Sequence, residues 1–224
     1  MEKPEFDQHA DRYDQILGDS MPVGLNEDTY FAEYKIALAA SRMGGSTVRH
    51  ILDYGCGAGR SLPYIEQYFP SAEIWGYDVS PASLEFAGQR LPVAKLFSDW
   101  SNAASTQFDL IISANVFHHI PPANRLFALK QCFDSLSEGG KLFLFEHNPY
   151  NPATRWIFEH CPFDEDAEML SLKQSLELAV AAGFKSIDHG YTLFFPRPLA
   201  FLRGMEPYMR RIPLGAQYYV RMEK

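Results

Sequence analysis

The sequence feature that most restricts the fold is a glycine-rich turn within residues 51–60, Ile-Leu-Asp-Tyr-Gly-Cys-Gly-Ala-Gly-Arg. A short apolar run, 48–54, leads directly into three alternate glycines, and residues 61–69 then read as a helix. Glycine permits positive φ and lets a ligand approach the backbone without interference from a Cβ. The unpaired N–H groups at the start of a helix favour an anionic ligand group. The turn therefore predicts a ligand site between a strand and a helix.

Strand-like and helix-like segments alternate through the middle of the chain. Apolar runs predict strands at 48–54, 73–77, 93–97, 108–113 and 141–145. Caps and apolar spacing predict helices at 61–69, 80–90 and 122–136, and we expect the pair Gly139–Gly140 to end the last of these helices. Repeated alternation of this kind predicts a parallel sheet with helices on both faces.

The end of the chain departs from this alternation. A helix at 172–182 ends at Gly183, and two strand-like runs follow at 185–195 and 216–222 with four prolines between them. Because no crossover helix separates these runs, they are expected to pair antiparallel. We predict one α/β domain with a Rossmann-like, doubly wound sheet of seven strands, mostly parallel with an antiparallel last strand. A helical appendage at about 28–43 precedes the sheet, and an insertion precedes the last strand.

The charge is uneven along the 224 residues. The chain carries a net −8, yet residues 197–224 carry +4 and the preceding 196 residues carry −12. An acidic body repels nucleic-acid phosphates, so a nucleic-acid partner is disfavoured. No apolar run reaches the roughly 18 residues that a membrane span needs. The polar, acidic start and three distant cysteines predict a cytoplasmic protein without disulfides.

Arg60 stands where the dinucleotide fingerprint G-x-G-x-x-G would place its third glycine, which disfavours a nicotinamide-dependent oxidoreductase. The run from Ile51 to Gly59 instead resembles the first motif of class I S-adenosylmethionine (SAM)-dependent methyltransferases, in which two apolar residues precede D-x-G-x-G-x-G. Residues 75–80, 98–100, 108–120 and 136–142 resemble later motifs of that family in the same order. The resemblance covers about residues 48–147, and the two final strands fit the family's reversed ending.

This resemblance implies SAM as the cofactor and S-adenosylhomocysteine (SAH) as the product. It implies that Asp78 binds both ribose hydroxyls, that Asp99 holds the adenine amine and that Trp100 packs on the adenine ring. The implied cofactor-binding residues are Tyr13, Asp53, Gly55, Cys56, Gly57, Gly59, Asp78, Val79, Asp99, Trp100 and Asn115. Other readings stay open: Asp78 as a helix cap, Asp99 in an Asx turn, and Cys56 as a small residue without reactivity. Asp53 either meets the ammonium of the cofactor or orders the turn.

Three histidines are candidates for the catalytic site. Methyl transfer from a sulfonium is an in-line displacement that depends chiefly on positioning, and a hydroxyl acceptor also needs a base. His118 and His119 follow the fourth predicted strand and His147 follows the fifth, at the edge where such sheets bind ligands. Their alternative role is loop structure beside the methionine tail, and His147 and Tyr150 also fit a substrate wall. No acidic cluster has metal-ligand spacing, so we expect no metal.

Residues 6–14 resemble the small-molecule branch of the family, as in ubiquinone-biosynthesis methyltransferases, where such a segment closes over the cofactor. Tyr13 is then either a contact that excludes water or part of a surface helix. Residues 1–47 are expected to form the lid and helical appendage, 48–147 the cofactor-binding core, and 148–224 the substrate-side elements and final strands.

The expected acceptor is a small molecule methylated on oxygen, carbon or aliphatic nitrogen, such as a sugar or lipid intermediate. An Asn-Pro-Pro-Tyr-like motif is absent after the fourth strand, which disfavours a protein or RNA methyltransferase. A non-catalytic SAM-binding protein is the main alternative. The basic segment 197–214 fits a wall for an anionic acceptor, a transient membrane contact or a solvated loop. The pattern predicts no particular oligomeric state.

Overall fold

The computed structural model describes residues 28–45, 47–103 and 106–224. Over these residues one sheet has seven strands in the order β3-β2-β1-β4-β5-β7-β6. Strands β1 to β5 pair in parallel, and β7 is antiparallel to both of its neighbours, which confirms the predicted fold. The strands are β1 His50–Tyr54, β2 Glu73–Tyr77, β3 Lys95–Phe97, β4 Phe108–Ala114, β5 Leu136–His147, β6 Ser186–Thr192 and β7 Gln217–Glu223.

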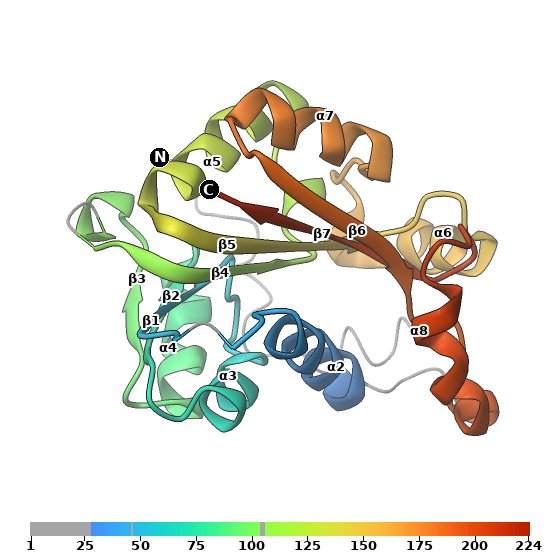
Figure 1. Cartoon of the computed structure of the whole chain (residues 1–224), viewed down its shortest axis with the longest axis horizontal. Helices are drawn as coiled ribbons and strands as arrows, with labels where there is room; N and C mark the ends of the chain where they lie inside the picture. Colours follow the sequence, from blue (N-terminus) through green and yellow to red (C-terminus); the bar gives the residue numbers. More distant parts are fainter. Residues whose placement is uncertain (1–27, 46, 104–105) are drawn as a thin grey trace.

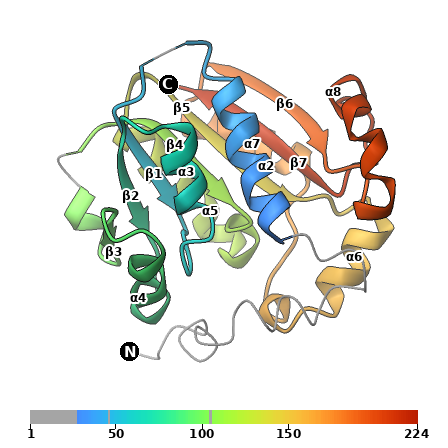
Figure 2. The same cartoon turned by 90° about the horizontal axis from the view of Figure 1, so that it is seen from below.

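The helices form layers on the two faces of the sheet (Figure 1). One layer consists of α2 Asp28–Ser41, α3 Leu62–Tyr68 and α4 Pro81–Arg90, and the other of α5 Pro122–Ser135 and α7 Leu172–Ala182. Each layer covers its own buried apolar cluster against the sheet. The helix predicted before the first strand is confirmed as α2, which lies beside α3 (Figure 2).

Local sequence signals explain where several elements begin and end. Ser80 caps α4 by accepting a hydrogen bond from the Ser83 N–H, and Pro81 occupies the first turn. Ser171 and Gln174 form a reciprocal capping box at the start of α7. Gly183 ends α7 in the left-handed conformation, as predicted.

The predicted role of Gly139–Gly140 is wrong. Helix α5 already ends at Ser135, and Leu136 begins β5, so the two glycines lie inside the strand. Leu136 pairs with Phe108 of β4, and the register then shifts before Leu110 pairs with Lys141. The chain leaves the helix as soon as Leu136 reaches the neighbouring strand, because strand pairing overrides the helical apolar spacing.

Two further parts of the fold lie outside the predicted elements, although Asn151 and Pro152 carry a helix-start signal for the first of them. Between β5 and α7 lie α6 Pro152–Glu159 and a 3₁₀ turn, Pro162–Asp164. The insertion before β7 holds 3₁₀ turns over Arg197–Met205, interrupted by a kink at Leu199, and the short helix α8 Glu206–Met209. Among the described residues, no helix is both long enough and apolar enough to cross a membrane.

Candidate active site

The glycine turn is held closed by its own backbone. The amides of Gly55 and Cys56 both donate to the Tyr77 carbonyl oxygen, at 2.8 and 2.9 Å, and the Gly59 amide donates to the Cys56 carbonyl oxygen at 2.9 Å. Gly57, at φ +50°, has no atom of the described residues within 4 Å of the position where a Cβ would stand. The turn is therefore anchored to the end of β2 while its Gly57 backbone is open to a ligand.

Asp78 extends this anchoring. One carboxylate oxygen accepts from the Gly57 N–H at 2.8 Å, and the other accepts from the Ser80 N–H at 2.9 Å. Asp78 thus fixes both the turn and the start of α4, in line with the helix-cap alternative. A carboxylate oxygen can accept more than one hydrogen bond, so this role does not by itself rule out a contact with the ribose hydroxyls. That ribose contact stays a prediction.

Two buried charged residues lie beneath the turn. Burial, aided by Asp78, raises the pKa of Asp53 to about 7. Lys35 reaches this region from α2, and burial lowers its pKa to about 8 although Glu146 and Asp53 favour its charge. Lys35 is not among the predicted site residues, because nothing within the helix pattern shows that one lysine is directed into the protein.

Asp53→Asn is expected to stabilise the ligand-free protein increasingly as the pH rises from 4 to 8. The folded protein holds a proton on Asp53 that the unfolded chain releases near its ordinary pKa of 3.8, so the wild type loses stability as pH rises towards about 7. Three pH units correspond to at most about 4 kcal/mol of unfolding free energy. Urea unfolding at several pH values measures this effect. Parallel pH curves for variant and wild type would contradict it.

Asp99, which was predicted to hold the adenine amine, adopts the alternative geometry, an Asx turn. Its carboxylate accepts from the Ser101 N–H at 2.9 Å, forming an Asx turn at the surface. Trp100 packs edge-on against Tyr77 and Tyr54, with ring centroids 5.0 and 5.5 Å apart. Val79 is exposed and Cys56 is buried, and burial raises the pKa of the Cys56 thiol, which makes it a poor nucleophile. Their contacts with the cofactor stay predictions.

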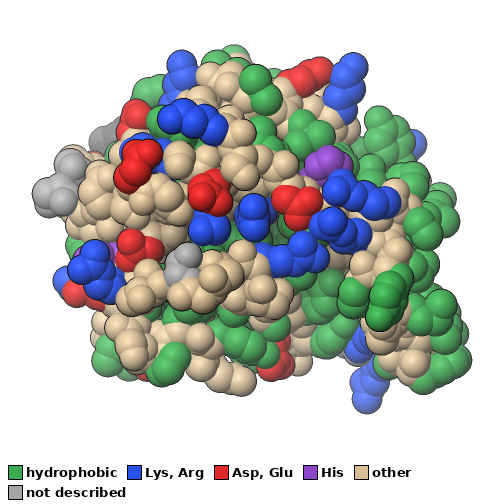
Figure 3. Space-filling view, in the orientation of Figure 1, with side chains coloured by type: hydrophobic (Ala, Val, Ile, Leu, Met, Phe, Trp, Pro, Cys, Tyr) green, Lys and Arg blue, Asp and Glu red, His purple; other side chains and the backbone are tan. Residues whose placement is uncertain are grey.

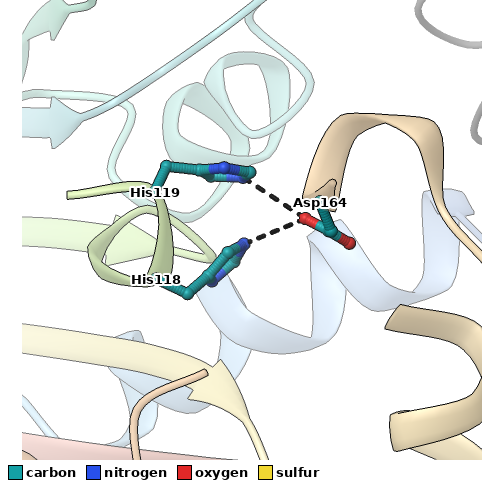
Figure 4. A group of neighbouring side chains, drawn as sticks. All are labelled: His118, His119 and Asp164. Carbon is teal, nitrogen blue, oxygen red and sulfur yellow. Dashed lines mark ion pairs between the residues drawn. The ribbon is translucent and has the colours of Figure 1, made fainter. Parts of the chain in front are cut away.

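The three candidate histidines meet at one edge of the sheet, as their positions predicted. His118 and His119 lie in a 3₁₀ turn after β4, and His147 is the last residue of β5. The ring centroid of His118 is 4.1 Å from that of His119 and 5.2 Å from that of His147. Asp164 completes the group from the turn after α6, facing His118 and His119 (Figure 4).

His118 is held between two carboxylates. Its Nδ1 lies 2.6 Å from a Glu146 carboxylate oxygen, and its Nε2 lies 3.4 Å from a carboxylate oxygen of Asp164. Burial opposes the charge, but the two carboxylates outweigh it and raise the pKa of His118 to about 9. Burial and the neighbouring His118 lower the pKa values of His119 and His147 to about 4. His118 is therefore held by a carboxylate on each side of its ring, and the catalytic role of the three histidines stays a prediction.

Glu146 and Val116 connect this group to the glycine turn. The second Glu146 oxygen accepts from the Val116 and Phe117 amides, at 3.1 and 2.7 Å. Val116 packs so closely on Gly55 that a Cβ there would clash with the valine methyl groups. Asn115, at φ 58°, donates its amide to Phe145. The histidines therefore lie one side-chain layer from the glycine turn.

Sequence reasoning missed Glu146 and Asp164. Glu146 is fully buried. The signal that could have identified it is its place directly after the apolar run of β5. Asp164 carries no comparable signal, because only the fold brings this segment to the histidines. Tyr13 and the predicted lid 6–14 lie outside the described residues. Tyr150 is exposed, and its amide donates to the Asn148 side chain.

The basic insertion makes contacts within the chain. The Arg203 guanidinium lies 3.8 Å from the ring centre of Tyr30 in α2. Arg210 and Arg211 pair with Asp188 of β6, at 3.0 and 3.6 Å. Hydrophobic side chains gather on the same side of the molecule (Figure 3). The most exposed apolar side chains of this segment are those of Tyr208, Phe201, Leu214 and Met205. A role in acceptor or membrane binding stays a prediction.

The proteins that this chain resembles are methyltransferases. Residues 52–142 match the family described as a methyltransferase domain. A trans-aconitate 2-methyltransferase of Methylobacterium radiotolerans is 39% identical over 98 residues, 42% of this chain and 36% of the relative. Another, of Variovorax paradoxus, is 25% identical over 200 residues, 78% of this chain and 76% of the relative. A ribosomal RNA small subunit methyltransferase C of Pseudomonas entomophila is 27% identical over 142 residues, 59% of this chain and 43% of the relative.

The matched stretches span only 35–45% of the first three curated relatives, which are all trans-aconitate 2-methyltransferases. The fold match is more complete. The plantazolicin methyltransferase BpumL, solved with a triazolic desmethyl analogue and SAH, has a TM-score of 0.66 at 17% identity, covering 97% of this chain and 94% of that one. The matches do not single out the ubiquinone-biosynthesis branch. Residues 52–142 are thus similar to a methyltransferase domain, and the fold is shared with solved SAM-dependent methyltransferases.

Proposed function

We propose that this protein transfers a methyl group from SAM to a carboxylate oxygen of a small polycarboxylic acid such as trans-aconitate. The observation that carries the proposal is the Variovorax paradoxus relative, named for trans-aconitate, which aligns over most of both chains. In this proposal, residues 48–147 hold the cofactor, and the elements after β5 complete the acceptor side. Asp164, which joins the histidines from that later segment, supports the division.

The chemistry of the histidine group fits a carboxylate acceptor. A carboxylate is already ionised near neutral pH, so its methylation needs alignment with the sulfonium and no proton removal. Carboxylate oxygens of Glu146 and Asp164 face the two ring nitrogens of His118, so the ring is held in place by the protein rather than directed at a substrate hydroxyl. The site is therefore built to position an acceptor more than to deprotonate one.

An RNA acceptor is the second candidate, because one relative is named for ribosomal RNA. Against it stand the net charge of −8 and the −12 carried by residues 1–196. The predicted sugar or lipid intermediates are further alternatives, since they share a small size and an oxygen nucleophile.

The test is formation of SAH with a panel of acceptors. The protein is incubated with SAM and trans-aconitate, citrate, the trimethyl ester of trans-aconitate, a sugar phosphate or total bacterial RNA. We expect SAH and a product one methyl group heavier with a free polycarboxylate, and neither product with the trimethyl ester, which lacks a carboxylate. Turnover restricted to the sugar phosphate or to RNA would overturn the carboxylate proposal.

A further inference from the structure

Three side chains at the carboxyl edge of the sheet have the donor set of a divalent transition-metal site. The two imidazole nitrogens are the Nε2 atoms of His118 and His119, and a carboxylate oxygen of Asp164 is the third donor. These atoms lie within 4.8 Å of one another (Figure 4). We propose that this group binds one divalent first-row transition ion, Zn²⁺ or Fe²⁺.

The distances match coordination better than direct hydrogen bonding. The Asp164 oxygen is 3.4 Å from the His118 Nε2 and 3.5 Å from the His119 Nε2. An N–H···O hydrogen bond is typically about 2.9 Å long. Ligands bound to an ion at about 2.0–2.1 Å in a tetrahedron lie about 3.3–3.4 Å apart. Both separations are thus close to the edge of such a tetrahedron.

Glu146 supplies the outer support that metal-binding histidines usually have. Its carboxylate lies 2.6 Å from Nδ1 of His118, so this nitrogen is fixed and Nε2 is directed at Asp164. The other Glu146 oxygen is held by two backbone amides, those of Val116 and Phe117. The first imidazole is therefore oriented before any ion binds.

The Asp164 segment is also fixed against the histidine turn. The Glu168 amide donates to the His118 carbonyl oxygen at 2.9 Å. The buried Arg125 side chain donates to the carbonyl oxygens of Ile120 and Glu168, at 2.9 and 2.7 Å, and so joins the two segments. These contacts preorganise ligands that are far apart in the sequence, and they explain why spacing alone predicted no metal.

The group contains three protein ligands, and its outer members are accessible. The side chain of His118 is 1% exposed, whereas those of His119 and Asp164 are 23% and 10% exposed. Three ligands and an open side are typical of a catalytic rather than a structural metal site. Because Glu146 and Val116 connect the group to the glycine turn, the open side is suited to hold a carboxylate of the acceptor. That last role rests on the proposed function, whereas ion binding itself does not.

The test of the site uses chelator-treated full-length protein without SAM or acceptor. Co²⁺ binding is followed by absorption spectroscopy, because the visible bands of Co²⁺ report its coordination geometry. Zn²⁺ has no such bands, so its binding is measured by calorimetric titration. We expect one ion per chain, with affinity lowered at least 100-fold in both Asp164→Ala and His119→Ala. Asp166→Ala, which removes an exposed carboxylate two residues away, is expected to bind as the wild type does. Circular dichroism checks that each variant is folded.

Absence of stoichiometric binding by the wild type, or unchanged affinity and spectra in both ligand variants, would overturn the site. A second titration measures trans-aconitate binding to SAH-bound protein with and without Zn²⁺. At least tenfold tighter binding with Zn²⁺, lost in Asp164→Ala, supports the acceptor role. Ion binding without any effect on trans-aconitate binding, or equally fast methyl transfer by ion-free protein, would overturn that acceptor role alone.

Discussion

Gly59→Ala is expected to lower the free energy of unfolding by about 2–5 kcal/mol. Gly59 has φ +79°, a left-handed conformation that costs an alanine about 1–2 kcal/mol. The new Cβ would also lie 2.7 Å from the Ala87 Cα and 2.9 Å from its Cβ, and such overpacking costs about 1–3 kcal/mol more. Urea unfolding of the ligand-free protein measures the loss.

Gly57→Ala is the matched control for this stability measurement. Gly57 also has positive φ, but within the described residues nothing stands within 4 Å of its Cβ position. It should therefore show the conformational cost of about 1–2 kcal/mol without the steric one. Equal losses in the two variants would mean that α4 does not pack on the turn at Ala87 as described.

Asp78→Ala is expected to weaken SAH binding at least 100-fold. The substitution removes the acceptor of the Gly57 and Ser80 amides, so the turn loses its tie to the start of α4. Leaving partly buried donors without a partner costs about 1–3 kcal/mol each, before any lost ribose contact is counted. Calorimetric titration with SAH measures the change.

Asp134→Ala is the control for that titration, because Asp134 is an exposed acidic residue at the end of α5. In the wild type, SAH at 100 times its Kd should also stabilise the fold by about 2.7 kcal/mol. Unchanged SAH affinity in a folded Asp78→Ala protein would show that Asp78 neither organises the turn nor meets the ribose.

Most of the fold could be predicted because its elements carry local signals. The glycine turn, the Ser80 cap and Gly183 each restrict the backbone within a few residues, and the apolar runs identify the strands. The start of β5 could not be predicted in this way. Leu136 fits the apolar spacing of α5, and only its pairing with Phe108 turns it into strand.

The site residues likewise fall into those with a local sequence signal and those that only tertiary packing brings to the site. The residues after β1, β2 and β4 could be predicted because parallel strands bring their carboxyl ends to one edge. Lys35 and Asp164 could not, since they come from other parts of the chain and depend on tertiary packing. Asp164 in particular reaches His118 through the backbone contact of Glu168 and the side chain of Arg125.

The most direct test of the central claim follows the methyl group itself. SAM labelled with ¹³C at its methyl carbon is incubated with trans-aconitate and protein supplied with Zn²⁺ or Fe²⁺, and the label is followed by NMR. The account predicts that the label leaves the sulfonium and appears as a methyl ester while an equal amount of SAH forms. Label that stays on SAM, in protein that binds SAH and with every acceptor of the panel, would contradict the account and identify a non-catalytic SAM-binding protein.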